Sequence, residues 1–245
     1  MIYIISIFIS FLFSEISPGY TLFSPLSNQG GGNYITYLID NEGNYINTWS
    51  HDCRPVSISY LLPDSSLVVP CTQNEVDGLG GGNQSSGGRI LKLSWIGDVL
   101  WDDIFVEDYF QPHHDIEPLD NGNILFVTYE RKTYTEAIAM GRENIDDEIW
   151  PTMIIELEQT GVYSSEIVWE WHLWDHTIQD INSNLDNYGV ISEHPELLDI
   201  NLGTLGGGGG SSGDWIHTNS IDYNENLDIL VISSRKMNEF YFIDH

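Results

Sequence analysis

Residues 113–132 read HHDIEPLDNGNILFVTYERK, and residues 217–236 read HTNSIDYNENLDILVISSRK. Each segment opens with His-x-Asp or His-x-Asn, passes through a turn rich in acidic or amide residues, continues in an apolar run and ends in Arg-Lys. A strand-turn-strand unit that recurs along a chain is typical of an array such as a β-propeller. Histidine, amide and arginine at matching places predict one polar site built from several repeats.

Three further segments share an alternating strand, a turn with glycine and a second strand that ends in tryptophan: 34–49 (YITYLIDNEGNYINTW), 89–101 (RILKLSWIGDVLW) and 152–171 (TMIIELEQTGVYSSEIVWEW). This pattern predicts β-hairpins. Each hairpin is followed by a second strand-turn-strand unit, so we expect four strands, or one propeller blade, in each period. The predicted fold is all-β: a partial β-propeller of three blades, with FYFID at 240–244 as the first strand of a fourth.

Four segments interrupt the repeat. Residues 76–88 and 203–213 are rich in glycine and serine, which predicts surface loops. Residues 131–150 contain a predicted short helix over TEAIAMG (135–141), and residues 172–202 are expected to form a second, partly helical excursion. Long loops of this kind often shape a site above a rigid scaffold.

The charge of the chain narrows its partners. Of 245 residues, 37 are Asp or Glu and 8 are Lys or Arg, which gives a formal net charge of −29. A protein needs a basic face to bind nucleic acid, so this composition excludes nucleic acid as a partner. For the same reason it excludes binding to an anionic membrane surface. Half of the cations belong to the two Arg-Lys pairs at 131–132 and 235–236.

The N-terminal run MIYIISIFISFLFS is too short to span a bilayer but fits the core of a signal peptide. We therefore expect residues 1–18 to be a signal peptide and the protein to be exported, to the periplasm or outside the cell, with no membrane association after cleavage. The two cysteines, Cys53 and Cys71, are predicted to form a disulfide that closes a loop of about twenty residues. No Cys-x-x-Cys or Cys/His metal spacing is present, so no metal site is expected.

The histidines of the repeated segment are the first candidates for chemistry. His113, His114 and His217 precede strands that we expect to be innermost in their blades, where a propeller builds its site. The ungapped match sets His113 against His217, whereas a match of Ile116 with Ile221 shifts the first copy by one residue and brings His114 into play. The residues alone do not decide which histidine faces the channel.

Arg235 is the second candidate, because a planar guanidinium suits tetrahedral oxyanions such as sulfate or phosphate esters. The other members of the two Arg-Lys pairs are better explained as surface salt bridges. His172 and His176 have the i, i+4 spacing of metal ligands on a helix. They lie in a segment dense in aromatic residues, which favours packing instead.

Several segments together resemble the bacterial arylsulfotransferase (aryl-sulfate sulfotransferase) family: RILKLSWIGDVLWD, HHDIEPLDNGNIL, EIVWEWHLWDHTIQD and DWIHTNSIDYNENLDILVISSRKMNEFYFID. The resemblance covers residues 20–245, and DWxHxNSxDY followed by a strand and Ser-Ser-Arg is its most specific part. It implies an exported six-bladed propeller. It also implies transfer of a sulfuryl group from a phenolic sulfate ester to a phenol through a sulfated histidine, with no cofactor and no nucleotide sulfate donor.

The resemblance also implies roles for particular residues. His217 and Asn219 match the family's His-x-Asn, Arg235 matches its sulfate-contacting arginine, and His113 or His114 matches its earlier active-site histidine. The histidine that becomes sulfated belongs to a later blade, beyond the last residue given. We therefore expect either a C-terminally truncated chain of three to four blades, or a gene product that lacks the nucleophile and cannot run the family reaction alone.

The expected organisation is a partial propeller sulfotransferase domain over residues 19–245, with its oligomeric state open. Two other functions are left open by the residues. One is a metal-dependent propeller hydrolase with His113, His114 and His217 as ligands. The other is a propeller that binds a ligand without catalysis.

Overall fold

The computed structural model describes residues 17–27, 33–73, 79, 86–205 and 213–245. Nearly all of the predicted signal peptide and most of the two glycine- and serine-rich segments lie outside these residues. Among the helices of the described residues, none has the length and apolar character needed to cross a membrane.

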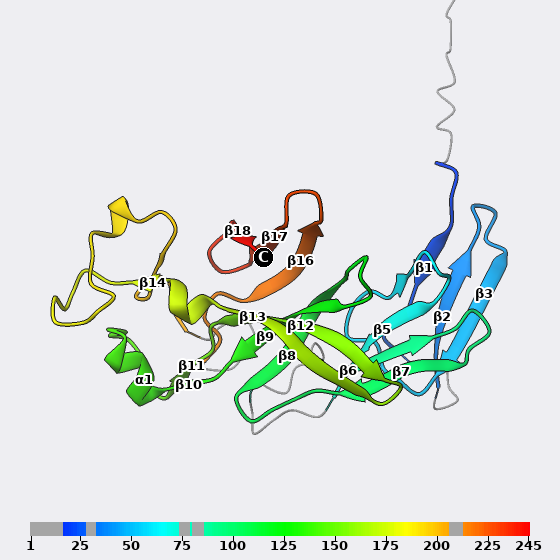
Figure 1. Ribbon diagram of the computed structural model, residues 1–245, viewed down its shortest axis with the longest axis horizontal. Helices are drawn as coiled ribbons and strands as arrows, with labels where there is room; N and C mark the ends of the chain where they lie inside the picture. The colour runs from blue at the N-terminus through cyan, green and yellow to red at the C-terminus, as the bar shows by residue number, and fades with distance from the viewer. Residues whose placement is uncertain (1–16, 28–32, 74–78, 80–85, 206–212) are drawn as a thin grey trace, which may run out of the picture.

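Four antiparallel sheets follow one another along the described part of the chain, from the blue first sheet to the red fourth sheet of Figure 1. The first sheet contains β1 (Thr21–Phe23), β2 (Tyr34–Ile39) and β3 (Tyr45–His51), in that spatial order. The second contains β4 (Tyr60–Leu61), β5 (Leu67–Cys71), β6 (Arg89–Leu93) and β7 (Val99–Ile104). The third contains β8 (Phe110–Pro118), β9 (Ile124–Glu130), β12 (Thr152–Gly161) and β13 (Ser164–His172). The fourth contains β16 (Thr218–Asn224), β17 (Ile229–Ser234) and β18 (Glu239–Asp244).

Two excursions project together to the left in Figure 1. The first contains β10 (Lys132–Thr133), α1 (Tyr134–Ala139) and β11 (Glu148–Ile149). The second contains a 3₁₀ turn (Leu173–His176), β14 (Thr177–Ile178), a second 3₁₀ turn (Ile191–Glu193) and β15 (Leu198–Asp199). The predicted short helix is confirmed as α1, which begins with a capping box between Thr133 and Glu136. The predicted helical character of the second excursion takes the form of the two 3₁₀ turns.

The predicted hairpins 34–49, 89–101 and 152–171 are present as β2–β3, β6–β7 and β12–β13. The prediction that each hairpin forms a sheet with the strand-turn-strand unit that follows it is wrong. Each of the last two hairpins pairs with the unit before it, because β6 pairs with β5 and β12 with β9. The run 240–244 lies in β18, which pairs with β17 and is the third strand of its sheet rather than the first strand of another.

The central strand of the third sheet, β9, is buried along its whole length. Its residues alternate between two apolar cores. Ile124 and Phe126 pack against the second sheet, whereas Leu125 and Val127 pack against the fourth. Because successive side chains of a strand point to opposite faces, one strand joins three sheets.

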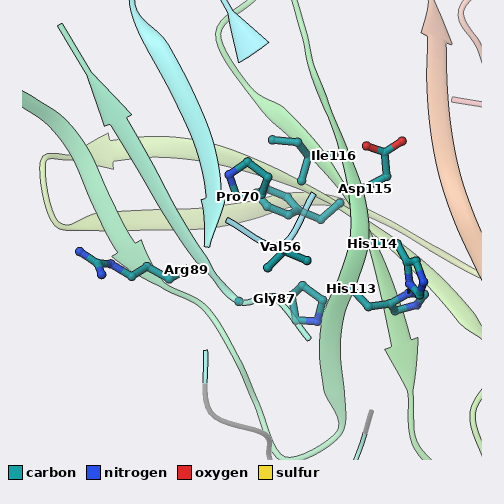
Figure 2. A pocket seen from close by; sticks show the side chains of 11 residues that line it. Val56, Pro70, Gly87, Arg89, His113, His114, Asp115 and Ile116 are labelled. Carbon is teal, nitrogen blue, oxygen red and sulfur yellow. Dashed lines mark hydrogen bonds between the residues drawn. The ribbon is translucent and has the colours of Figure 1, made fainter. Parts of the chain in front are cut away.

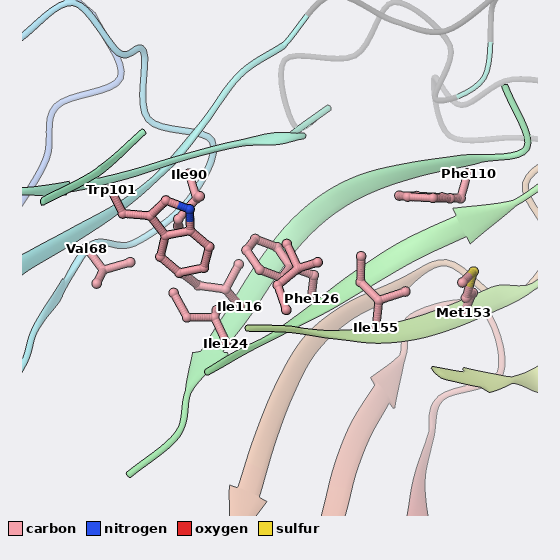
Figure 3. Close-up of a cluster of buried hydrophobic side chains, with 10 residues drawn as sticks. Val68, Ile90, Trp101, Phe110, Ile116, Ile124, Phe126, Met153 and Ile155 are labelled. Atoms are coloured by element: carbon pink, nitrogen blue, oxygen red, sulfur yellow. The ribbon is translucent and has the colours of Figure 1, made fainter. Parts of the chain in front are cut away.

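The second sheet repeats this arrangement through β5. Val68 belongs to the core shared with the third sheet, whereas Leu67 and Val69 belong to the core shared with the first. Figure 3 shows the shared core, in which side chains of the second sheet meet those of the third: Val68, Ile90 and Trp101 with Ile116, Ile124, Phe126 and Ile155. The sheets are therefore stacked face to face in chain order.

The tryptophans that end the hairpins contact the following sheet. The Trp49 indole nitrogen on β3 donates a hydrogen bond of 3.0 Å to the carbonyl oxygen of Ser94 in the second sheet. Trp101 on β7 packs into the core shared with the third sheet, and Trp169 and Trp171 on β13 pack against the core shared with the fourth. The repeated tryptophan thus has one repeated function, which is to cover the joint between sheets.

The two cysteines lie at the joint between the first two sheets. Cys53 follows β3, Cys71 ends β5, and the structure joins them in a disulfide with their Cα atoms 5.4 Å apart. Backbone hydrogen bonds flank the disulfide on both sides, from Val56 to Pro70 and from Thr72 to Arg54. The cross-link therefore fixes the connection between the two sheets.

Arg142 connects the two excursions. It follows the C-terminus of α1, where Gly141 adopts a φ of +88° that allows the helix to end in a tight turn. The buried guanidinium of Arg142 donates to the carbonyl oxygens of Ile200 (2.5 Å), Leu202 (3.3 Å) and Gly203 (3.2 Å). A buried cation needs such partners, and here peptide carbonyls of the second excursion supply them.

We expect Phe126→Ala to lower the free energy of unfolding by about 3–5 kcal/mol, because it opens a cavity in the core between the second and third sheets. Phe242→Ala is the matched control: Phe242 is 77% exposed, so its truncation should change stability by less than about 0.5 kcal/mol. Urea denaturation followed by tryptophan fluorescence measures both. Equal effects of the two substitutions would contradict the stacked arrangement.

Candidate active site

The first strands of the third and fourth sheets, β8 and β16, lie against each other. Asp115 on β8 accepts a hydrogen bond of 3.3 Å from the backbone N–H of Ile221 on β16. The stacking of the sheets therefore brings the beginnings of the two repeated segments together, although they are separated by about a hundred residues of sequence.

Both segments depart from regular strand geometry at a histidine. The pairing of β8 with β9 is interrupted between Pro112 and Ile116, which is a bulge. Within it His114 has a φ of +58°, and His217 has a φ of +53° directly before β16. Left-handed backbone is uncommon for a residue with a side chain, and it clusters at functional sites.

Three histidines form one cluster. The Nδ1 atoms of His113 and His114 are 2.7 Å apart, and the rings of His114 and His217 meet edge to face with centroids 5.0 Å apart. The ring of His113 stacks on Tyr129 at 3.6 Å and is almost completely buried. His114 is therefore the histidine of the first copy that faces the second copy, with His113 behind it.

Burial is the main cause that lowers the pKa of both histidines of the first copy. It lowers the pKa of His113 well below its usual value, assisted by the charges of His114 and His217. It lowers the pKa of His114 to about 4, with His217 adding to the effect, Asp214 opposing it and Arg235 adding to it. Both side chains are neutral imidazoles at pH 7.

A cation and a carboxylate complete the cluster around His217. Arg235 Nη1 lies 3.5 Å from Nε2 of His217, and the Arg235 amide donates to the carbonyl oxygen of His217 at 3.1 Å. On the other side of the ring, His217 Nδ1 lies 2.6 Å from Oδ2 of the buried Asp214. Lys236 Nζ lies 3.4 Å from the same oxygen and donates to the Asp214 backbone carbonyl.

Both copies are irregular at their start, but the two irregularities differ in size. In β8, residues 113–115 lie between the pairs that Pro112 and Ile116 make with β9, whereas in β16 Asn219 lies between the pairs of Thr218 and Ser220. The histidine of the first copy that lies against His217 is His114, whereas the ungapped match sets His113 against it.

The two Arg-Lys pairs are not equivalent in space. Three positions after Phe126 stands Tyr129, whereas three positions after Ile232 stands Arg235. Arg131 lies beyond this position, with Nε 3.2 Å from a carboxylate oxygen of Glu148. The prediction that both arginines occupy matching places is wrong, and only the second copy brings its arginine to the histidines.

Asn219 lies on β16, and its side chain is exposed. Its Oδ1 accepts a hydrogen bond of 2.8 Å from the hydroxyl of Ser233 on the neighbouring strand. Asn219 is thus held on the same two strands as His217 and Arg235, at the solvent-accessible side of the sheet.

Acidic side chains lie along β8 and β16, after the histidines of each repeated segment. Glu117 on β8 has its pKa raised to about 7, first by burial and then by the charges of Asp222 and Asp115. Burial is also the main cause that raises the pKa of Asp115, whose Oδ1 accepts a hydrogen bond from the Tyr60 hydroxyl at 3.3 Å. The site therefore has a cationic end and an acidic end.

A cavity of about 10 Å³ lies beside the histidines, between β8 and the second sheet. This volume holds about one water molecule, so the cavity is no substrate pocket. Figure 2 shows Arg89 at one side of it and the rings of His113 and His114 at the other, next to β8. The histidines that matter for a ligand are reached from the face where β16 lies.

The remaining histidines have separate partners. His172 contacts Glu130 at 3.1 Å, and its pKa is raised, mainly by this hydrogen bond; His176 stacks on Trp171. The other three are held by their own neighbours: His51 by Thr36, His194 by Glu196 and His245 by Glu156 and Asp228. Across the described ranges, no set of three or more His, Cys, Asp and Glu side chains has the arrangement of a metal site.

Sequence reasoning missed two features of this cluster. Asp214 was not singled out, although its position three residues before His217 within DWIH was a usable signal. Lys236 was assigned to the surface, whereas it lies beside the buried Asp214. Trp215, next to Asp214, is fully buried and donates to the Leu202 carbonyl oxygen at 2.8 Å.

Comparison with known families gives one match. The family model described as Arylsulfotransferase (ASST) matches residues 20–245. A comparison with curated proteins found no match for the chain. The matched range contains the four sheets and every residue of the histidine cluster.

We expect the stability of the protein to fall as the pH rises from about 4.5 to 7, partly because of Glu117. Its folded-state pKa of about 7 lies above the ordinary value of 4.5, so the native state binds the extra proton in this range and loses it as the pH increases. Glu117→Gln should raise the free energy of unfolding at pH 8 by about 1 kcal/mol, after allowance for screening, and leave it nearly unchanged at pH 4. Urea denaturation at both pH values measures the difference.

The exposed Glu42 on a turn of the first sheet offers a control, since Glu42→Gln should change the free energy of unfolding by less than about 0.5 kcal/mol. A gain from Glu117→Gln that is the same at pH 4 and pH 8 would show that the carboxyl is not protonated in the native state.

Proposed function

Because the chain belongs to the arylsulfotransferase family, we propose that the protein is an aryl-sulfate sulfotransferase. It transfers a sulfuryl group from a phenolic sulfate ester to a phenol, through a sulfohistidine intermediate and without a nucleotide sulfate donor. One observation supports this proposal above all: Arg235 lies 3.5 Å from His217, whose ring contacts His114 of the neighbouring sheet. In a chain with 8 Lys and Arg, a guanidinium at a histidine cluster is a specific feature.

Arg235 has the chemistry that an aryl sulfate requires. A sulfuryl group in transfer, like a phosphoryl group, carries its charge on three non-bridging oxygens, and stabilisation comes from cations and donors already in place. The guanidinium offers a planar pair of N–H donors to two of these oxygens. Asn219, on the adjacent strand, is within the same two-strand region and offers an amide N–H₂.

The histidines have distinct proposed roles. His217 gives a proton to the phenolate that leaves the donor ester in the first half of the reaction and takes a proton from the acceptor phenol in the second. His114 is neutral at pH 7, because its pKa is about 4, so it acts as a hydrogen-bond partner rather than a cation. His113 stabilises His114 from behind through the Nδ1–Nδ1 contact.

The family resemblance implies a sulfated histidine in a later blade of the propeller. We assign this role to none of the eight histidines of the sequence. Transfer is measured on the full-length gene product.

We extend the proposal to architecture and location. Four sheets stacked face to face, with β8 and β16 side by side, support blades of a six-bladed propeller around a channel. The disulfide between Cys53 and Cys71 supports export, because such bonds persist in oxidising compartments.

Incubation with 4-nitrophenyl sulfate and phenol tests the function. The expected result is release of 4-nitrophenolate that depends on phenol, together with formation of phenyl sulfate detected by mass spectrometry. Release that requires bound zinc or calcium and yields free sulfate would favour a metal-dependent hydrolase. Binding of aryl sulfates without any transfer would favour a binding protein.

We expect Arg235→Gln to lower kcat/KM for 4-nitrophenyl sulfate by about 100-fold or more, since it removes the charge that faces the sulfuryl oxygens. Arg131→Gln is the matched control from the other Arg-Lys pair. Arg131 faces Glu148 at 3.2 Å, away from the histidines, so its replacement should change kcat/KM by less than about twofold. Equal losses in the two variants would overturn the role of Arg235.

A further inference from the structure

Asp214 is buried next to the proposed proton-exchanging histidine and has no role in the function described so far. Its side chain is 1% exposed, although it carries a carboxylate. A carboxylate that is withdrawn from water must be stabilised by hydrogen bonds or by opposite charge. Its Oδ2 lies 2.6 Å from His217 Nδ1 and 3.4 Å from Lys236 Nζ, whereas Oδ1 has no hydrogen-bond partner among the described residues.

The contact with His217 fixes a tautomer. A carboxylate oxygen accepts hydrogen bonds only, so at 2.6 Å the Nδ1 atom of His217 must carry the hydrogen. Nε2 then presents its lone pair when the ring is neutral, toward Arg235 Nη1 at 3.5 Å. Without Asp214 the hydrogen is free to move to Nε2, where it would point at the guanidinium.

Lys236 is oriented by the same group. Its Nζ donates to the Asp214 backbone carbonyl and lies near Oδ2, and Asp214 opposes the lowering of the Lys236 pKa that burial causes. Lys236 directly follows Arg235 in the sequence. The contact with Asp214 holds the Lys236 ammonium on the Nδ1 side of the His217 ring. Arg235 is left as the cation that faces Nε2.

The backbone holds this geometry in place. His217 has a φ of +53°, and its carbonyl oxygen accepts from the Arg235 amide, while the Lys236 amide donates to the Ile216 carbonyl at 3.3 Å. Asp214 itself makes a β-bridge with Trp150, two residues before β12 of the third sheet. Asp214 and His217 are thus fixed on the segment before β16, against Arg235 and Lys236 in the turn after β17.

We propose that Asp214 is a positioning residue that locks His217 in the Nδ1–H tautomer, so that Nε2 is the atom that exchanges the proton with the phenol oxygen. The inference rests on the proposed sulfotransferase function. When the S–O bond of the aryl sulfate breaks and the sulfuryl group passes to the nucleophilic imidazole, the departing phenolate oxygen takes the proton from Nε2. In the second half-reaction Nε2 takes the proton of the acceptor phenol as its oxygen bonds to sulfur. The ring is therefore an imidazolium before the first step, the neutral Nδ1–H tautomer between the two steps and an imidazolium again after the second, and the Asp214 carboxylate stabilises the charged form.

Two substitutions remove the charge of Asp214. Asp214→Asn keeps one oxygen that can accept the Nδ1 hydrogen, whereas Asp214→Ala removes the acceptor. We expect kcat to fall by about 100-fold or more in Asp214→Ala and also in Asp214→Asn, because the amide can turn its N–H₂ group toward Nδ1 and favour the other tautomer, with KM for 4-nitrophenyl sulfate within about threefold of wild type. A defect in substrate binding would change KM instead.

The tautomer is read directly by NMR on protein labelled with ¹⁵N-histidine, with the His217 signals assigned from a His217→Gln sample. In spectra recorded on the neutral ring, wild-type His217 should show Nδ1 protonated and Nε2 free, and Asp214→Ala should lose this preference. This measurement needs no activity, so it decides the proposal even if sulfuryl transfer is not found. If Asp214→Ala does not fold, the wild-type spectrum alone decides it.

Glu130 supplies a matched control. It is another buried carboxylate held between a histidine and a lysine, with His172 Nδ1 at 3.1 Å and Lys132 Nζ at 2.6 Å, outside the His217 cluster. Glu130→Ala should lower the melting temperature as Asp214→Ala does, but leave kcat within about twofold. A wild-type Nε2–H tautomer, or equal losses of kcat in the two alanine variants, would overturn the proposal.

Discussion

The two-sided burial of the central strands β5 and β9 is the constraint on which the rest of the structure depends. A strand whose alternate side chains enter two different cores must have a sheet on each face, and these strands have no polar face to expose. Stacking of the sheets follows from this, and so does the contact of β8 with β16. His114 reaches His217 because Ile124 and Phe126 on one face of β9, and Leu125 and Val127 on the other, hold three sheets in line.

The positions of the strands could be predicted from the sequence more reliably than the pairing between them. The hairpins 34–49, 89–101 and 152–171 were predicted because their turns are local signals. Their grouping was not, since β5 pairs with β6 across a glycine- and serine-rich stretch, and β9 pairs with β12 across the first excursion. The residues near a turn do not indicate which neighbouring strand a hairpin pairs with. That pairing depends on which apolar faces are buried across the whole sheet, and the hydrophobic periodicity of one segment does not predict it.

The candidate site was predictable in its residue types and less so in its arrangement. His217 and Arg235 were identified, and they lie together. The orientation of His113 and His114 depended on the bulge between Pro112 and Ile116, which a repeat read without gaps cannot reveal. Asp214 was overlooked because a carboxylate in a chain with 37 acidic residues carries little information until its burial is known.

The left-handed backbone at His114 and His217 has a further consequence for how the protein can change. A residue with a Cβ in this conformation costs about 1 kcal/mol relative to glycine, and both positions carry imidazoles. Replacement of either by glycine would relieve this strain while it removes the side chain.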